Sequence, residues 1–252
     1  NLEPGLKVYI EYSNECWNGI FSQATYCRDK GKAMGLSDSD YQAQLRYYSK
    51  RAVEIFKIWG EGFGGTKRLV RVLAAQSANP WTSEQVMEFE EAYKHADALA
   101  IAPYFGNALG DPKTQDEISK WTVDQVLDRC AEYIRQGNET IARQASSAKQ
   151  RGLRLVAYEG GQHLVGYSGA ENNKALEGLF QAANRHPRMK QLYLDYLAGW
   201  RRSGGTLMVL FSSLGTYSKW GSWGLMEYHG QPAGEAPKYQ VAIEFLDKNG
   251  GH

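Results

Sequence analysis

The stretch "KVYIEYSNECWNG", residues 7–19, decides the fold class, because a short apolar run ends abruptly in a cluster of polar groups. The apolar residues 8–10 predict a strand with largely buried side chains. Directly after it, the segment from Ser13 to Trp17 places hydroxyl, amide, carboxylate, thiol and indole groups together. Functional groups gather in this way at the carboxyl ends of the strands of a parallel sheet.

Four further apolar runs follow along the chain, and longer amphipathic segments separate them. The runs are almost continuously apolar, which suits strands buried on both faces of a parallel sheet. The sequence therefore predicts an α/β fold in which about five parallel strands alternate with helices. No low-complexity linker divides the chain, so residues 1–252 are expected to form a single domain. The four runs are 69–75, 98–102, 153–158 and 206–211.

The segments between the runs are predicted to be helices from their apolar spacing and their end signals. Apolar side chains within residues 41–59 recur every three or four positions, and the glycines of "GEGFGG", residues 60–65, end that helix. The stretches "TSEQ" at 82–85 and "TVDQ" at 122–125 have the capping-box pattern that begins a helix. Two further helical segments are 173–202, broken near Pro187, and 238–247.

Charge and hydropathy exclude several classes of protein. The chain has Lys+Arg 29 against Asp+Glu 28, so its net charge of +1 gives no electrostatic case for binding nucleic acid or an anionic membrane. No apolar run approaches the roughly 20 residues needed to span a bilayer, and a soluble protein is expected. The first residues, "NLEPGLK", lack an initiator Met and a signal-peptide pattern, so either a leader was removed or the chain belongs to something longer. The compartment, secreted or cytoplasmic, is left open.

The cysteines and histidines give no sign of a metal or cofactor. The chain has three cysteines without CxxC spacing, which predicts neither a zinc site nor a disulfide framework. Cys16 and Cys27 either pair with each other or remain buried thiols. His163 and His229 lie apart and without the spacing of metal ligands, so we expect no metal site.

Two carboxylates follow apolar runs directly, and they are the candidate catalytic residues. Glu15 follows the first run and Glu159 the fourth. Two carboxylates converging on one face are what glycoside hydrolysis requires, one as proton donor and one as nucleophile or base. The other strand ends supply amides, hydroxyls and aromatics, which suit a neutral polyhydroxy substrate. The candidate substrate-binding residues are Asn14, Trp17, Tyr104, His163, Trp220 and Trp223.

Each of these groups also has a purely structural interpretation. A glutamate at the end of a strand often caps a helix or forms an ion pair. The "EGG" at 159–161 is consistent with a turn that needs positive φ. The catalytic interpretation gains weight because carboxylate, amide, tyrosine and tryptophan all occur at strand ends of one predicted sheet.

The stretch "VYIEYSNECWNG" resembles the fourth strand of clan A glycoside hydrolases, the (β/α)8 retaining enzymes that include cellulases, mannanases and β-galactosidases. "LVAYEGG", residues 155–161, is similar to their seventh strand. The resemblance implies that Glu15 is the acid/base, Asn14 the ligand of the sugar 2-hydroxyl and Glu159 the nucleophile. It also implies that Tyr104 orients the nucleophile and that Trp220 or Trp223 is a sugar platform.

The resemblance covers strands four to eight only, so it implies an incomplete TIM-type barrel. Such a sheet has two exposed edges, next to the strands that hold Glu15 and Phe211, and an open apolar interior. Unpaired edges and uncovered core favour association. We therefore expect a homo-oligomer in which a neighbouring subunit covers the gap.

The expected function is a retaining β-glycosidase that acts on an oligo- or polysaccharide or on a small β-glycoside. A cellulase-like endoglucanase and an exo-acting β-glucosidase or β-galactosidase both fit. The alternative from another class is a non-catalytic carbohydrate-binding protein or an inactive barrel remnant. A hydrolase or transferase of another α/β type is disfavoured, because the sequence has no GxSxG or Walker motif, and its stretch with GxGxxG spacing, residues 60–65, ends a predicted helix instead of following a strand.

Overall fold

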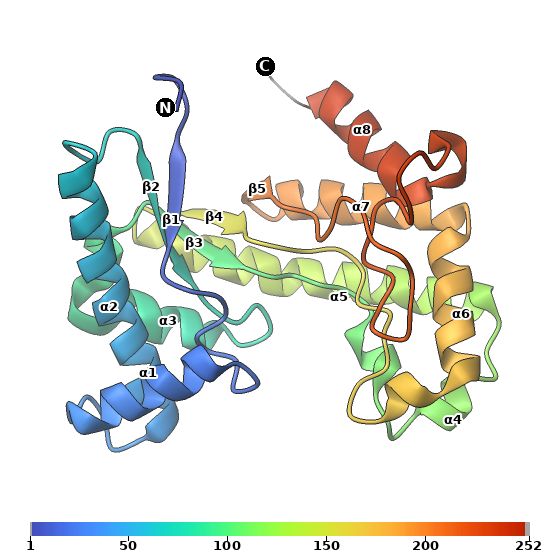
Figure 1. The fold of residues 1–252 in the computed structure, drawn as a ribbon, viewed down its shortest axis with the longest axis horizontal. Coiled ribbons are helices and arrows are strands. Elements are labelled where there is room, and N and C mark those ends of the chain that lie inside the picture. Colours follow the sequence, from blue (N-terminus) through green and yellow to red (C-terminus); the bar gives the residue numbers. More distant parts are fainter. Residues whose placement is uncertain (1, 250–252) are drawn as a thin grey trace. The chain divides into compact units, whose positions relative to one another are not determined.

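The computed structural model describes residues 2–249, in which five strands form one sheet in the order β1-β2-β3-β4-β5 (Figure 1). Neighbouring strands run parallel, as the register of β1 with β2, β2 with β3 and β3 with β4 shows. This confirms the predicted α/β fold with five parallel strands alternating with helices. The strands are β1 (Val8–Glu11), β2 (Leu69–Ala74), β3 (Ala98–Ile101), β4 (Arg154–Ala157) and β5 (Gly205–Met208).

The chain divides into two compact units. Unit 1 runs to Ala102 and adds Thr140–Tyr158 and Gly204–Leu207, so it contains the sheet apart from the last residue of β5. Unit 2 consists of Pro103–Glu139, Glu159–Ser203 and the chain from Met208 onward. The single domain expected from the sequence stays a prediction.

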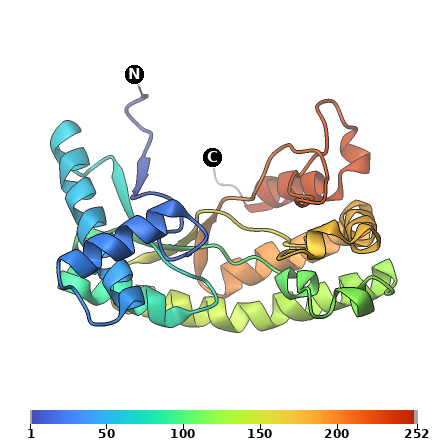
Figure 2. The same cartoon turned by 60° about the horizontal axis from the view of Figure 1, so that its bottom comes forward.

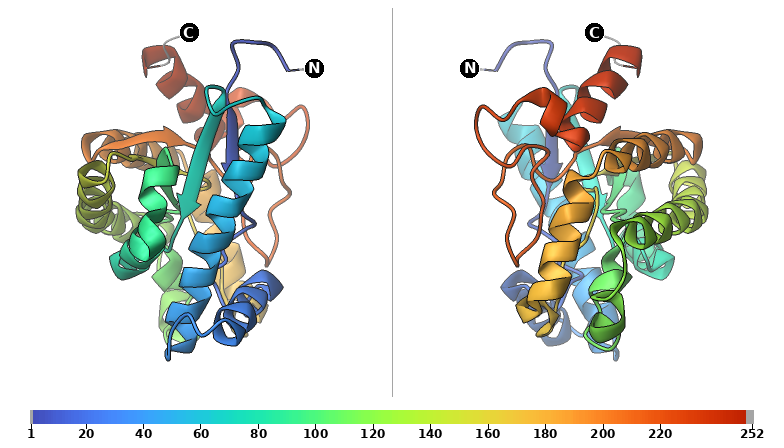
Figure 3. Two further views of the ribbon diagram at one scale, coloured as in Figure 1. Left: turned by 90° about the vertical axis from the view of Figure 1, so that its left-hand side faces the viewer. Right: turned by 90° about the vertical axis from the view of Figure 1, so that its right-hand side faces the viewer.

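In unit 1 the helices α1 (Ser22–Ala33), α2 (Asp40–Gly62) and α3 (Pro80–Glu88) accompany the first strands. Helix α2 begins at Ser39, whose side chain accepts a hydrogen bond from the Gln42 N–H, and runs alongside β2 (Figure 3, left). Helix α1 packs against α2 (Figure 2) at Gly31, where an added Cβ would lie 2.2 Å from the carbonyl oxygen of Ala43. A glycine is therefore needed at this crossing.

The strands differ in burial according to their place in the sheet. β2 and β3 are almost completely buried, whereas the edge strands β1 and β5 are partly exposed. Tyr9 on β1 is 45% exposed and Leu207 on β5 is 41% exposed. The two edges predicted from the sequence are thus the two ends of the strand order.

Unit 2 is built around an apolar core that includes Phe105, Leu127, Phe180 and Tyr193. The helix break expected near Pro187 is present, because one helix ends at Arg185 and the next begins at Arg188. Its helices are α4 (Gln115–Ile118), the first part of α5 (Val123–Gln150), α6 (Lys174–Arg185), α7 (Arg188–Arg202) and α8 (Pro237–Asn249). Short 3-10 helices are η1 (Phe89–His95) in unit 1, and η2 (Asn107–Gly110), η3 (Ala170–Asn172) and η4 (Ala233–Glu235) in unit 2.

One of the two capping predictions is confirmed and one is wrong. The N–H of Thr122 donates to Gln125 Oε1 at 2.8 Å and the N–H of Gln125 donates to Thr122 Oγ1 at 3.2 Å, a complete capping box before α5. Helix α3, however, begins at Pro80, and the Thr82 hydroxyl inside it donates to the Asn79 carbonyl. Proline at the first helical position, with its fixed φ, sets an earlier start than the predicted box.

None of the helices within residues 2–249 is long and apolar enough to cross a membrane.

Candidate active site

The carboxylate of Glu15 lies just beyond β1 in unit 1 and is 9% exposed. The amide Nδ2 of Asn18 donates to Oε2 at 2.7 Å, and the hydroxyl of Tyr158 donates to Oε1 at 2.9 Å. The amide of Asn18 is itself oriented, because its Oδ1 accepts the N–H of Ile20 at 3.2 Å. Both carboxylate oxygens of Glu15 therefore have a hydrogen-bond donor in a fixed position.

The backbone around Glu15 is strained. Ser13 has φ 61° and Glu15 has φ 43°, both in the left-handed region that non-glycine residues rarely occupy. Each such residue costs about 1–3 kcal/mol and persists only where its surroundings hold it. Here Gln23 Nε2 donates to the Asn14 carbonyl at 2.6 Å, and Gln44 Nε2 donates to the Cys16 carbonyl at 2.7 Å. Strain of this kind clusters at functional sites.

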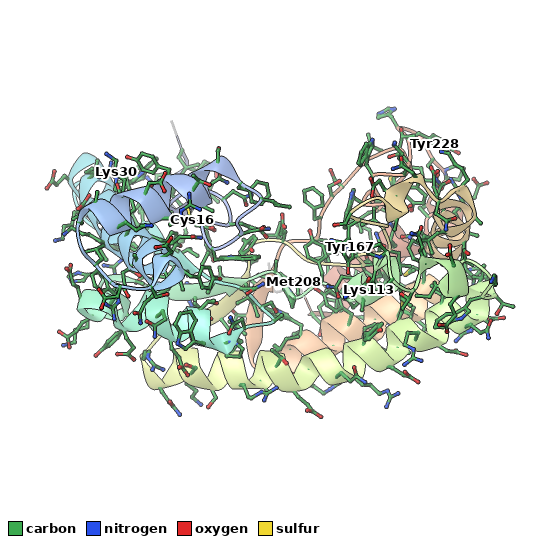
Figure 4. All side chains as sticks on the ribbon, turned by 90° about the horizontal axis from the view of Figure 1, so that it is seen from below. Cys16, Lys30, Lys113, Tyr167, Met208 and Tyr228 are labelled. Atoms are coloured by element: carbon green, nitrogen blue, oxygen red, sulfur yellow. The ribbon has the colours of Figure 1, made fainter. Side chains whose placement is uncertain are left out.

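Trp17 and the two nearby cysteines are packed into unit 1. The indole Nε1 of Trp17 is buried and has no hydrogen-bond partner within residues 2–249. Cys16 and Cys27 are both free and buried, and their thiols hydrogen-bond to each other, with Cys16 lying against α1 (Figure 4). This hydrogen bond lowers the pKa of Cys27 despite its burial. Of the two alternatives for this pair, the structure has the buried thiols.

In unit 2, Glu159 is separated from the end of β4 by one residue, Tyr158, and forms a hydrogen bond with the side chain of Tyr104. Burial raises the pKa of Tyr104, and the neighbouring Glu159 carboxylate raises it further. Tyr104 therefore stays protonated, and its hydroxyl donates a hydrogen bond to the Glu159 carboxylate. The contact expected between these two side chains is present.

The glycines after Glu159 are required by the packing of this turn. A Cβ on Gly160 would lie 2.4 Å from the hydroxyl oxygen of Tyr196. Gly161 has φ 137°, and a Cβ there would lie 2.8 Å from the hydroxyl oxygen of Tyr193. The structural interpretation of "EGG" as a turn needing glycine therefore holds beside any catalytic role of Glu159.

Three aromatic rings, from the segments that follow three different strands, pack edge to face beside this turn. The ring centroids of Tyr104 and His163 lie 5.6 Å apart, those of Tyr104 and Trp223 5.8 Å, and those of His163 and Trp223 5.1 Å. Burial lowers the pKa of His163, so its ring is neutral near pH 7. Its Nδ1 is buried and has no hydrogen-bond partner in the described part of the chain. We call Tyr104, His163 and Trp223 the aromatic cluster.

The two candidate platform tryptophans differ sharply in environment. Trp223 is half-buried in the aromatic cluster and also contacts Phe211 at 5.8 Å between ring centroids. Trp220 is 65% exposed, and its carbonyl accepts the indole N–H of Trp223 at 2.8 Å. The segment that carries both, drawn orange-red between β5 and α8, is largely irregular (Figure 3, right). Tyr228, labelled in Figure 4, is 52% exposed on the same segment.

The eight candidate site residues thus fall into two groups. Asn14, Glu15 and Trp17 belong to unit 1, and the other five belong to unit 2. The pairing of Glu15 with Glu159 as catalytic partners stays a prediction. Two residues that the sequence analysis missed, Asn18 and Tyr158, bind the Glu15 carboxylate. The only sequence signal for them was their position beside candidate residues, because Asn18 follows Glu15 by three residues and Tyr158 precedes Glu159.

Within residues 2–249, no group of three or more His, Cys, Asp or Glu side chains could hold a metal ion.

No protein-family model matches the chain, and searches among curated proteins and among solved structures find no match either. The fold class therefore rests on the structure itself, and the resemblance to clan A glycoside hydrolases stays a prediction from the two strand-end motifs.

Proposed function

We propose that the protein is a retaining glycoside hydrolase that cleaves β-glycosidic bonds by a two-glutamate double displacement. One observation carries the proposal: each of the two glutamates follows a strand of one parallel sheet, and each carboxylate is hydrogen-bonded by a tyrosine. Tyr158 binds Glu15 and Tyr104 binds Glu159. A glutamate that merely caps a helix or forms a surface ion pair does not need such a partner.

In the proposed reaction, an oxygen of Glu159 attacks the anomeric carbon while the bond to the leaving oxygen breaks and Glu15 gives that oxygen its proton. A glycosyl ester on Glu159 results. Glu15, now ionised, takes a proton from water, and the water oxygen displaces Glu159 from the anomeric carbon. Tyr104 fixes the direction of attack by holding the Glu159 carboxylate.

The surroundings of Glu15 determine which oxygen carries the proton. The Asn18 amide is oriented so that it can only donate to Oε2. A proton on Oε2 would therefore face the amide hydrogens of Asn18 and find no acceptor there. The hydroxyl of Tyr158 can donate or accept, and it can stay bonded to Oε1 in both protonation states. We therefore assign the transferred proton to Oε1 of Glu15.

The substrate proposed is a neutral sugar, as an oligo- or polysaccharide or a small β-glycoside. The aromatic cluster offers ring faces and edges, which suit the apolar faces of a sugar ring. Asn14 is proposed to bind the 2-hydroxyl, and Trp17 adds an indole N–H without a partner among the described residues.

The proposed assembly is a homo-oligomer that covers the two sheet edges. Apolar side chains are exposed on both of them, Tyr9 on β1, and Leu207 with Val209 and Phe211 at and after β5. A second copy that packs on these edges would remove the apolar surface from water and pair the free backbone groups.

A non-catalytic carbohydrate-binding protein is the second candidate. The exposure of Trp220 favours it, because a large aromatic ring open to solvent serves binding without any chemistry. In that case sugar binding would survive in Glu159→Gln while the parent chain shows no turnover.

The deciding experiment is hydrolysis of a panel of aryl β-glycosides by the parent chain, Glu159→Gln and Glu15→Gln. Glu159→Gln should lose a factor of about a thousand or more in kcat, because it removes the nucleophile. Glu15→Gln should keep more activity on substrates whose leaving group needs no proton. Glu139→Gln, at an exposed glutamate of α5, is the matched control. Absence of turnover on every sugar, or turnover unchanged in Glu159→Gln, would rule out the proposal.

A further inference from the structure

We infer that Lys238 is a positioning residue: it closes a buried ring of hydrogen bonds that fixes the aromatic cluster and the turn carrying Glu159. The effect on turnover rests on the proposed function, whereas the effect on structure does not. Lys238 lies in the first turn of α8 and has no part in the two-glutamate mechanism.

The ring joins four elements of unit 2. Lys238 Nζ donates to the carbonyl of Ser222 at 2.5 Å and to Asn184 Oδ1 at 3.0 Å. Asn184 Nδ2 donates in turn to Gln162 Oε1 at 3.3 Å, and Gln162 Nε2 donates back to the Ser222 carbonyl at 2.9 Å. The ring therefore connects α8, α6, the turn after β4 and the irregular segment 209–232.

All four members of the ring are shielded from water. Lys238 and Asn184 are 0% exposed, and Gln162 and Ser222 are 1% exposed. A lysine is almost never completely buried unless it is paired with an opposite charge. Within residues 2–249 Lys238 forms no salt bridge, and its ammonium is met by an amide oxygen, a carbonyl and the ring face of Tyr217 at 4.7 Å.

The carboxylate of Glu227, which acts on Lys238 electrostatically, is bound by another cation. Both oxygens of Glu227 accept hydrogen bonds from Arg185, at 2.8 and 2.6 Å. Burying a cation without its own ion pair costs free energy, and an apolar side chain of similar size would often be more stable. The retention of a lysine here indicates a requirement for its donors rather than for packing.

Two members of the hydrogen-bonded ring are sequence neighbours of residues in the candidate site, so the ring fixes the backbone of that site. Ser222 precedes Trp223, and Gln162 precedes His163 and follows Glu159 by three residues. His163 and Trp223 are thus attached to backbone that the buried hydrogen bonds hold in place. A shift of the Ser222 carbonyl would move Trp223 against Tyr104 and His163.

Two other polar side-chain links between the segment 209–232 and the rest of unit 2 are more exposed. Lys219 donates to Asn172 at 2.9 Å, and Arg185 binds Glu227, but Arg185 is exposed and Lys219 is only half-buried. Exposed ion pairs contribute little and are screened by salt. Beside the contacts of Trp223 and the backbone hydrogen bond from the Phe211 N–H to the Gly160 carbonyl at 3.0 Å, the buried ring is therefore the polar side-chain anchor of this part of the segment.

The test compares Lys238→Met with Lys248→Met, an exposed lysine of the same helix, by hydrogen–deuterium exchange of the full chain. In Lys238→Met the amides of residues 212–231 and 160–164 should exchange about tenfold faster or more, while those of α4 and α7 keep their rates. Lys248→Met should leave all of them unchanged. Unchanged exchange in residues 212–231, or an even rise throughout unit 2, would overturn the inference.

Kinetics supply a readout that a purely structural role would not move. On the best aryl β-glycoside, Lys238→Met should raise KM about tenfold and change kcat less than about threefold, because the glutamates remain while the sugar platform is displaced. Lys238→Gln, which keeps an amide donor, should restore part of the KM. An unchanged KM, or a loss confined to kcat, contradicts the inference.

The outcomes for this inference and for the proposed function remain separate. If the parent chain hydrolyses no glycoside, the proposed function fails and the exchange pattern alone decides on Lys238. If Lys238→Met does not fold, Lys238→Gln is measured in its place. Failure of both variants to fold would overturn the inference, because the lysine would then be needed by the whole unit rather than by one segment.

Discussion

The hydroxyl of Tyr158 donates a hydrogen bond to Oε1 of Glu15 at 2.9 Å, across a sequence separation of 143 residues. Tyr158 is also the residue directly before Glu159. One tyrosine therefore binds the first candidate catalytic carboxylate and is covalently joined to the residue that carries the second. The ends of β1 and β4 are linked at the side-chain level, which neither strand motif shows by itself.

Tyr158→Phe tests the role of this hydroxyl. It removes the partner of Glu15 Oε1, the oxygen to which we assign the transferred proton, and keeps the ring. We expect kcat to fall about 10- to 100-fold on substrates with a poor leaving group and much less on activated aryl glycosides. Steady-state kinetics on a matched pair of leaving groups measures this. Tyr228→Phe is the control, and an equal loss on both substrates would contradict the assignment.

Gly160→Ala should destabilise the protein. The added Cβ would lie 2.4 Å from the hydroxyl oxygen of Tyr196 and 3.0 Å from Met208 Sδ, and Tyr196 is itself buried. Such overpacking costs about 1–3 kcal/mol in the free energy of unfolding, which denaturant titration measures. Gly178→Ala in α6 is the control, because a Cβ there meets nothing within 4 Å and the change should stabilise by up to about 1 kcal/mol. Equal stability of the two variants would contradict the geometry of the turn.

Substitution of the two tryptophans should have different effects on stability and on sugar binding. Trp223→Ala removes a half-buried ring of the aromatic cluster, so we expect a loss of about 1–3 kcal/mol in stability. Trp220→Ala removes an exposed ring and should change stability by less than about 0.5 kcal/mol. For a sugar held on the cluster, Trp223→Ala should weaken binding of cellohexaose about tenfold or more, as titration calorimetry measures. A greater loss of affinity in Trp220→Ala than in Trp223→Ala would instead identify the exposed Trp220 as the sugar platform.

The sheet was predictable from sequence because buried parallel strands leave continuous apolar runs. The correspondence is good for 69–75 and 98–102, which contain β2 and β3. The run 206–211 overstates β5, which ends at Met208, and Val209 and Phe211 do not continue the strand. Apolar composition indicates where a strand lies, but it does not give the residue at which the strand ends.

Helix α1 was not predicted, and the reason lies in its buried face. Its buried residues are Ala24, Cys27 and Gly31, all small, so no stripe of large apolar side chains marks the helix. Helix α2, by contrast, buries Leu45, Tyr48 and other larger residues and was recognised from its spacing. Close packing of two helices through small residues leaves almost no periodic signal in the sequence.

The candidate site was predictable only where the contacting residues lie close to a strand end. Glu15, Glu159 and Tyr104 were found in this way. The partners Asn18 and Tyr158 and the ring that contains Lys238 depend on contacts between distant segments. A lysine directly after Pro237 looks like a solvated residue in a first helical turn, and nothing in its neighbours indicates that it is completely buried.

The burial of Lys238 also predicts how stability depends on pH. Burial lowers the pKa of Lys238 from its ordinary 10.5 to about 7, and the nearby Glu227 opposes this shift. Between these two values the unfolded chain binds a proton that the folded chain does not. The free energy of unfolding should therefore rise with pH across this window, by up to about 1.4 kcal/mol per pH unit for this one group. Below about pH 7 both states are protonated, and the contribution of Lys238 no longer changes with pH.

The measurement is the difference in unfolding free energy between the parent chain and Lys238→Met at about pH 6 and about pH 9. We expect the parent chain to gain about 2–3 kcal/mol relative to the variant at the higher pH. Tyr217, whose ring faces Lys238, does not titrate in this window, because burial raises its pKa further. Glu227 is held by Arg185, whose guanidinium keeps its charge throughout. If the difference in unfolding free energy stays constant with pH, Lys238 is charged in both the folded and the unfolded state. Its ammonium would then be the donor in the buried ring at both pH values.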